Sequence, residues 1–114
     1  PRGTHCHGLL TLVRATIASQ LVLTFTTNNV EFQTIVVNPN TVPLFVTNIN
    51  IPPKTRLRTF PDSELLSLCT RFNTQILYGD LNSRHANWDP NGDNAWTTSL
   101  FEVADVTYFQ IKAP

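Results

Sequence analysis

The hydrophobic and polar positions of the chain follow two different periods. An apolar run over residues 8–13 is typical of a buried strand, and residues 20–27 alternate between apolar and threonine-rich positions. Asn28-Asn29 is a turn signal, so residues 30–37 are expected to return as the second strand of a hairpin. A further strand is predicted over residues 44–51, where Pro52-Pro53 ends it.

The period then changes to that of a helix. Thr59, Pro61 and Asp62 supply helix-start chemistry, and an apolar stripe follows at i, i+3, i+4 and i+7. The stripe consists of Leu65, Leu68, Cys69 and Phe72, with Glu64 in the first turn and Arg71 in the last. The pattern also predicts a strand ending at Asp80, a second helix over residues 95–104 and a last strand over 106–111. Strands interleaved with helices predict an α/β protein with a mixed sheet and packed helices.

Composition and charge narrow the possible functions only slightly. At 114 residues the chain has room for one domain, and its eight basic and eight acidic residues cancel. Net charge therefore gives no support for a nucleic-acid partner, although a local basic patch would suffice. Two distant cysteines, Cys6 and Cys69, are expected to be reduced thiols of an intracellular protein. No apolar run approaches bilayer length, so no membrane partner is expected.

Chemistry concentrates in the segment YGDLNSRHANW, residues 78–88. An apolar run enters it, and a polar tip at the end of a buried strand is where a ligand can reach a sheet. Asp80 and Asn82 are two residues apart, so on an extended backbone their side chains would face one site. Gly79 lets neighbouring backbone approach without a Cβ in the way. The alternative is a tight turn built from common turn residues.

This segment resembles the signature of the endonuclease/exonuclease/phosphatase family, in the form found in non-LTR, jockey-like retrotransposons. Two upstream blocks, HGLLTLVR (7–14) and TNINIPP (47–53), are similar to further blocks of that family in the same order. The resemblance implies a layered, deoxyribonuclease-I-like α/β sandwich, of which residues 1–114 would be an incomplete domain lacking its N- and C-terminal parts. It also implies Mg²⁺-dependent nicking of DNA, within a polyprotein that includes a reverse transcriptase and works in the nucleus.

The resemblance makes four residues candidates for the active site, namely Asp80, Asn82, His85 and Asn50, and its roles are carried onto Asp80 and Asn82. Asp80 would orient and deprotonate the attacking water, and Asn82 would position the phosphate. His85 would contact phosphate or the active-site network, with a purely structural role in the loop as an equal alternative. Asn50 stands where the family has a tyrosine, and it cannot supply a phenolic hydroxyl. Trp88 is expected to be a packing anchor beneath the loop.

A small basic run is the candidate nucleic-acid contact. Lys54, Arg56 and Arg58 alternate after the proline pair, and Arg84 lies within the motif. Alternate cations on an extended loop can follow phosphates, but a solvated loop is the commoner explanation of such a run.

No metal ligand is assigned from the sequence. The family's metal-binding Glu and its terminal Asp-His pair have no counterpart here, and Glu31, Glu64 and Glu102 lie in the wrong sequence context to replace that Glu. A calcium loop at residues 89–93 fails in register, and His5-Cys6-His7 has no partner cluster.

Three hypotheses follow for the function. The first is a piece of a metal-dependent endonuclease domain. The second is a catalytically inactive remnant that acts only as a nucleic-acid or protein interaction module, and the third is an unrelated β-rich binding domain. Part of a sandwich would leave sheet surface uncovered, which predicts poor solubility.

Overall fold

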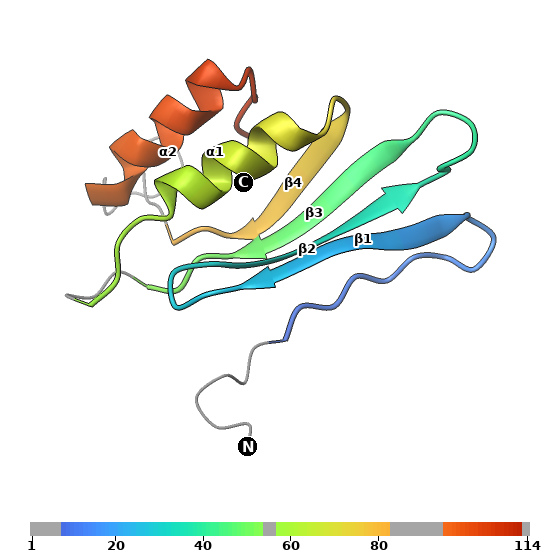
Figure 1. The fold of residues 1–114 in the computed structure, drawn as a ribbon, viewed down its shortest axis with the longest axis horizontal. Helices are drawn as coiled ribbons and strands as arrows, with labels where there is room; N and C mark the ends of the chain where they lie inside the picture. The colour runs from blue at the N-terminus through green and yellow to red at the C-terminus, as the bar shows by residue number, and fades with distance from the viewer. Residues whose placement is uncertain (1–7, 54–56, 83–94, 113–114) are drawn as a thin grey trace.

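The fold is a mixed four-stranded sheet with two helices on one face (Figure 1). It was obtained as a computed structural model that describes residues 8–53, 57–82 and 95–112, with side chains of the last segment described from Thr98 onward. The elements are β1 (Ser19–Thr26), β2 (Glu31–Val37), β3 (Leu44–Asn50), α1 (Asp62–Arg71), β4 (Gln75–Asp80) and α2 (Ala95–Val106).

The strands lie in the order β1-β2-β3-β4. The first three form an antiparallel meander, and β4 runs parallel to β3 after the chain crosses over through α1. The predicted α/β class, the hairpin and the mixed sheet are therefore confirmed. The finer expectation of a layered sandwich requires a second sheet, which the described residues do not include.

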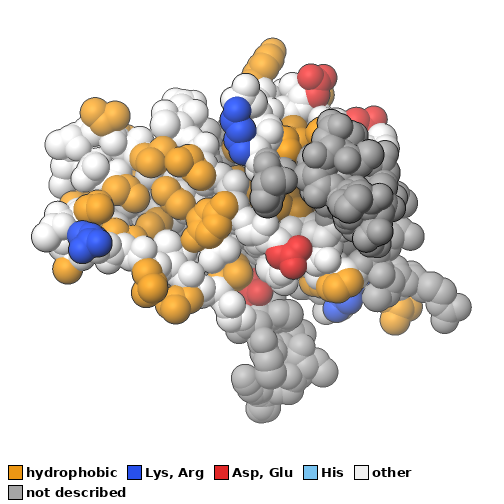
Figure 2. Space-filling view, turned by 180° about the vertical axis from the view of Figure 1, so that it is seen from behind, with side chains coloured by type: hydrophobic (Ala, Val, Ile, Leu, Met, Phe, Trp, Pro, Cys, Tyr) orange, Lys and Arg blue, Asp and Glu red, His pale blue; other side chains and the backbone are white. Residues whose placement is uncertain are grey.

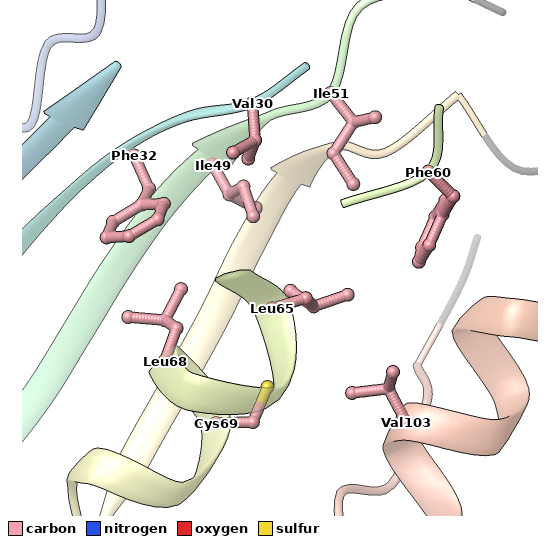
Figure 3. Packing of buried hydrophobic residues seen from close by; sticks show 9 residues of the cluster. All are labelled: Val30, Phe32, Ile49, Ile51, Phe60, Leu65, Leu68, Cys69 and Val103. Atoms are coloured by element: carbon pink, nitrogen blue, oxygen red, sulfur yellow. The ribbon is translucent and has the colours of Figure 1, made fainter. Parts of the chain in front are cut away.

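The hydrophobic core lies between the sheet and the helices (Figure 3). Helix α1 buries Leu65, Leu68 and Cys69, three members of the predicted apolar stripe, while Phe72 directly follows the helix and is half-buried. From the sheet and its flanking loops come Val30, Phe32, Ile49, Ile51 and Phe60, and α2 contributes Val103. The 3.6-residue period of α1 thus meets the two-residue period of β2 and β3 across one interface.

The start of α1 differs from the expected capping. Pro61 occupies the N-cap position, and no side-chain hydrogen bond caps the helix. Thr59 instead pairs with the β1–β2 turn: its backbone N–H donates to Asn29 Oδ1 at 3.2 Å, and Asn29 Nδ2 donates to the Thr59 hydroxyl at 3.4 Å. Thr59 therefore fastens the loop before the helix to the hairpin.

The apolar run 8–13 was predicted to be a strand, and this prediction is wrong for its described residues. The segment lies across the sheet face opposite the helices, where side chains hold it. Asn48 Nδ2 donates to the Leu10 carbonyl at 3.3 Å, and the Thr11 hydroxyl donates to Gln33 Oε1 at 2.9 Å. Leu10 and Leu12 are 74% and 85% exposed, whereas Leu9 and Val13 are half-buried, so only part of the apolar run is shielded from solvent.

The predicted last strand at 106–111 is also wrong, because α2 extends to Val106 and ends in a Schellman motif. Tyr108 adopts the left-handed conformation with φ 62°, and its N–H donates to the Asp105 carbonyl. The N–H of Phe109 donates to the Ala104 carbonyl at 2.9 Å. These two bonds satisfy carbonyls at the helix end and turn the following residues away from a strand path.

The sheet face opposite the helices carries an apolar row. Strand register aligns Leu21, Ile35, Val46 and Ile76 as direct neighbours across all four strands. The two outer members, Leu21 and Ile76, are 58% and 52% exposed. Figure 2 shows the molecule from behind, relative to Figure 1, and hydrophobic side chains gather over a broad area of this side.

None of the helices that the structure describes is long and apolar enough to cross a bilayer.

Candidate functional site

The same sheet face carries a polar row where β3 and β4 end. Glu31 at the start of β2 is the register partner of Asn50, and Asn50 is the partner of Asp80. Directly paired residues point to the same face of a sheet, so the three side chains stand side by side. Together with Gly8, Leu9 and Asn48 they line a pocket of about 380 Å³. This pocket is the candidate functional site.

Gly79 allows the end of β4 to come close to β3. Its φ is +143°, and a Cβ at this position would lie 1.8 Å from the Ile49 carbonyl oxygen. No other residue type fits that space or readily adopts that conformation. The expectation that Gly79 admits neighbouring backbone is thereby confirmed, and its consequence is that Asp80 lies in register beside Asn50.

Asp80 and Asn82 are connected differently from the expected extended pair. Strand β4 ends at Asp80, and Asn82 adopts a left-handed conformation with φ 49°, so the alternation of a strand does not reach it. The backbone N–H of Asn82 donates to Asp80 Oδ1 at 3.0 Å, which is an Asx-type turn. Asn82 Nδ2 donates to the Ile51 carbonyl at 2.6 Å. The Asn82 side chain thus fixes the turn to the end of β3, and it does not line the pocket.

Asn50 does line the pocket, at the position where the resembled family has tyrosine. It is half-buried, and within the described parts of the chain its side-chain amide makes no hydrogen bond. An amide of this kind can donate through its nitrogen or accept through its oxygen. It is therefore available to a ligand in the pocket, although it offers no phenolic hydroxyl.

Of the four predicted nucleic-acid-binding residues, the structure describes only Arg58. Arg58 Nε donates to the Asn28 carbonyl at 3.0 Å, and its Nη1 lies 3.5 Å from the Pro53 carbonyl oxygen. Arg58 thus ties its loop to the β1–β2 turn, and its predicted contact with nucleic acid stays a prediction. The other predicted site and motif residues lie outside the described residues, and they are Lys54, Arg56, Arg84, His85 and Trp88.

Glu31 is the site residue that sequence reasoning missed. Its sequence neighbours do not resemble a metal-binding block, but the hairpin register places it opposite Asn50. The turn at Asn28-Asn29 could have indicated this position, because the turn fixes where β2 begins and so which residue pairs with Asn50. The carboxylate and amide oxygens of the row are hard donors, the type of ligand that Mg²⁺ prefers. Among the described residues no group of three or more His, Cys, Asp or Glu could hold a metal ion, so a cation here would rest on two carboxylates and neighbouring oxygens.

Comparison with known proteins assigns no family. No protein-family model matches the chain, and neither the curated proteins nor the solved structures include a significant match.

Proposed function

We propose that this chain is part of a metal-dependent endonuclease domain that hydrolyses phosphodiester bonds in DNA. The observation that carries the proposal is the pairing of Asp80 with Asn50 at the ends of two parallel strands, beside an open pocket. Ligands of α/β sheets bind at this edge, where strand ends present side chains and the loops that follow. The resemblance of residues 78–88 to the endonuclease/exonuclease/phosphatase signature supplies the reaction class.

Each residue of the site has a role in that reaction. Asp80 orients and deprotonates the attacking water, since an exposed carboxylate beside the pocket can act as a general base. Asn50 hydrogen-bonds a phosphate oxygen, and Asn82 holds the turn that presents Asp80. Carboxylate oxygens of the row would hold the Mg²⁺ that the resemblance implies, and that ion would supply positive charge to stabilise the transition state. The resembled family uses this amide to position phosphate, whereas the proposal gives Asn82 a structural role in the turn.

The proposal extends to fold and partners. In a layered sandwich a second sheet would cover the apolar row formed by Leu21, Ile35, Val46 and Ile76. That second sheet would come from parts of the domain outside this chain, and a polyprotein with a reverse transcriptase would use the nicked DNA in the nucleus. The exposure of the two outer members of the row supports a covering layer of this kind.

A plasmid-nicking assay with Mg²⁺ tests the reaction. We expect wild-type protein to convert supercoiled plasmid to the open circle only slowly, because the family's metal-binding Glu and Asp-His pair have no counterpart in this chain. Asp80→Ala should lower that rate by at least about a hundredfold. Asp105→Ala is the matched control, because Asp105 is exposed on α2 away from the pocket. Equal nicking by wild type and Asp80→Ala would remove Asp80 from the mechanism.

One observation favours the second candidate function, an inactive remnant that acts as an interaction module. Asn50 lines the pocket where the family has tyrosine, so the site lacks a phenolic donor. Restoring the family residue with Asn50→Tyr separates the two functions. A rise in nicking would support a weakened enzyme, whereas no nicking by wild type or by Asn50→Tyr would favour the remnant.

A further inference from the structure

We infer that two copies of this chain associate through the open edge of β1, where the strand pairs in antiparallel orientation with β1 of the second copy. The two sheets then join into one continuous sheet across a two-fold axis. The inference does not depend on the proposed reaction, because it rests on the backbone and composition of an edge strand.

The outer edge of β1 has no strand beside it. β1 is the first strand in the sheet order and pairs only with β2 (Figure 1). Apart from this pairing, no residue of β1 makes a backbone hydrogen bond to any other described part of the chain. All residues of β1 except Leu23 are exposed. Such a row of unpaired N–H and C=O groups is a template for a further strand.

The segment that leads into β1 lies elsewhere and leaves this edge open. Residues 8–13 are its nearest candidate partner in the sequence, but side chains hold them across the sheet face. Asn48 Nδ2 donates to the Leu10 carbonyl at 3.3 Å, and the Thr11 hydroxyl donates to Gln33 Oε1 at 2.9 Å.

The opposite edge of the sheet, formed by β4, is not open in the same way. Residues 106–110 line one pocket together with Gln75–Tyr78, so the segment after α2 lies beside β4. Within the described segments, β1 therefore offers the edge that a second molecule can reach.

The composition of β1 suits pairing with itself. Its residues, SQLVLTFT, include no charged side chain and no proline, which are common protections of natural edge strands. Antiparallel pairing about a two-fold axis places the strand against its own sequence, so a charged strand would bring like charges together. β1 avoids that repulsion. A β-bulge between Leu21 and Leu23 interrupts its register, which leaves regular pairing to the residues on either side.

Pairing at this edge also shields apolar side chains on both faces of the sheet. Leu21, on the face opposite the helices, is 58% exposed, and Phe25, on the helix side, is 38% exposed. Phe25 stacks on Phe32 with ring centroids 5.0 Å apart, and both rings line a groove between β1 and α1. A strand added beside β1 extends both faces, so its side chains pack against Leu21 and Phe25.

The test is sedimentation velocity of the chain over a wide range of concentration. We expect wild type to form a dimer, and Thr24→Lys to raise its dissociation constant at least about tenfold, because a lysine on the edge strand opposes pairing. Thr70→Lys is the matched control, since Thr70 is exposed on α1 and lines the pocket on the β4 side. It should dimerise as wild type does. Both substitutions leave the apolar row intact, and circular dichroism checks that each variant is folded.

Amide hydrogen exchange of wild type locates the contact. Protection of the β1 backbone amides should rise with protein concentration, because pairing with a second copy satisfies the outer row of N–H groups.

Four results would overturn the inference. A wild type that stays monomeric at every concentration has no such dimer. A dimer that Thr24→Lys leaves unchanged forms through another surface, and equal weakening by Thr24→Lys and Thr70→Lys is an effect of net charge. Protection of β1 that does not vary with concentration means that another part of the same chain covers the edge. None of these results bears on plasmid nicking, so the proposed function stands or falls separately.

Discussion

At the scale of single residues, Gly79 decides whether the site can form. A side chain there would collide with the Ile49 carbonyl, and its φ of +143° is strained for any residue with a Cβ. We expect Gly79→Ala to lower the free energy of unfolding by about 3 kcal/mol, measured by urea denaturation. Gly8→Ala is the control, because a Cβ at Gly8 meets nothing within 4 Å. Equal stability of the two variants would contradict the close approach of β3 and β4.

Cys69 gives the fold a pH dependence above pH 9. Burial raises the pKa of this free thiol from 9.0 to about 11, and a hydrogen bond with Thr107 partly opposes the shift. Between those pH values the unfolded chain releases the proton while the folded protein keeps it, so stability falls as pH rises. The slope should be less than about 1.4 kcal/mol per pH unit. Thermal melts of wild type and Cys69→Ala from pH 8 to 11 check this, and an unchanged slope in the variant would exclude Cys69 as its source.

At the scale of elements, α1 shows how an amphipathic stripe fixes the sheet's covered face. Leu68 is 2% exposed within the core, whereas Leu66 on the same helix is 41% exposed. We expect Leu68→Ala to cost about 2–5 kcal/mol of stability and Leu66→Ala less than about 1 kcal/mol. Chemical denaturation measures the free energy of unfolding of both variants, which carry the same substitution at two positions of one helix. A similar cost for both would mean that α1 packs on the sheet through a different face.

Strands and helices with a strong period could be predicted from the sequence, and weakly patterned segments could not. The hairpin, β3, α1 and β4 all follow alternation or the 3.6-residue stripe. Residues 8–13 are apolar without alternation, and side-chain hydrogen bonds from Asn48 and Thr11 decide their path. The end of α2 depends on a left-handed Tyr108, a conformation that only glycine or asparagine would have signalled in advance.

Some residues of the candidate site could likewise be predicted from the sequence, and others could not. Gly79 and Asp80 could be predicted because a glycine–acid pair at a strand end is a local signal. Glu31 could not, because its place beside Asn50 depends on pairing between strands and on the exact register of the hairpin. An extended backbone would turn the Asp80 and Asn82 side chains to one site, whereas the left-handed φ of Asn82 turns its amide to the Ile51 carbonyl.

At the scale of the whole molecule, the apolar row opposite the helices governs behaviour in solution. Leu21 and Ile76 are more than half exposed on that face, and apolar surface of this kind promotes association. We expect the double variant Leu21→Thr, Ile76→Thr to self-associate less than wild type in sedimentation velocity, with little change in thermal stability. Threonine keeps the β-branched shape that a strand favours. A monomeric wild type at high concentration would contradict the exposed row.

The proposed function requires a divalent cation in the pocket beside Asp80 and Asn50, and paramagnetic broadening tests this requirement most directly. Substoichiometric Mn²⁺ added to ¹⁵N-labelled protein should broaden first the backbone amide signals of residues that line this pocket, and the side-chain amide of Asn50. Signals from α1 on the opposite face should persist. Broadening centred elsewhere, or uniform broadening over the surface, would contradict the account.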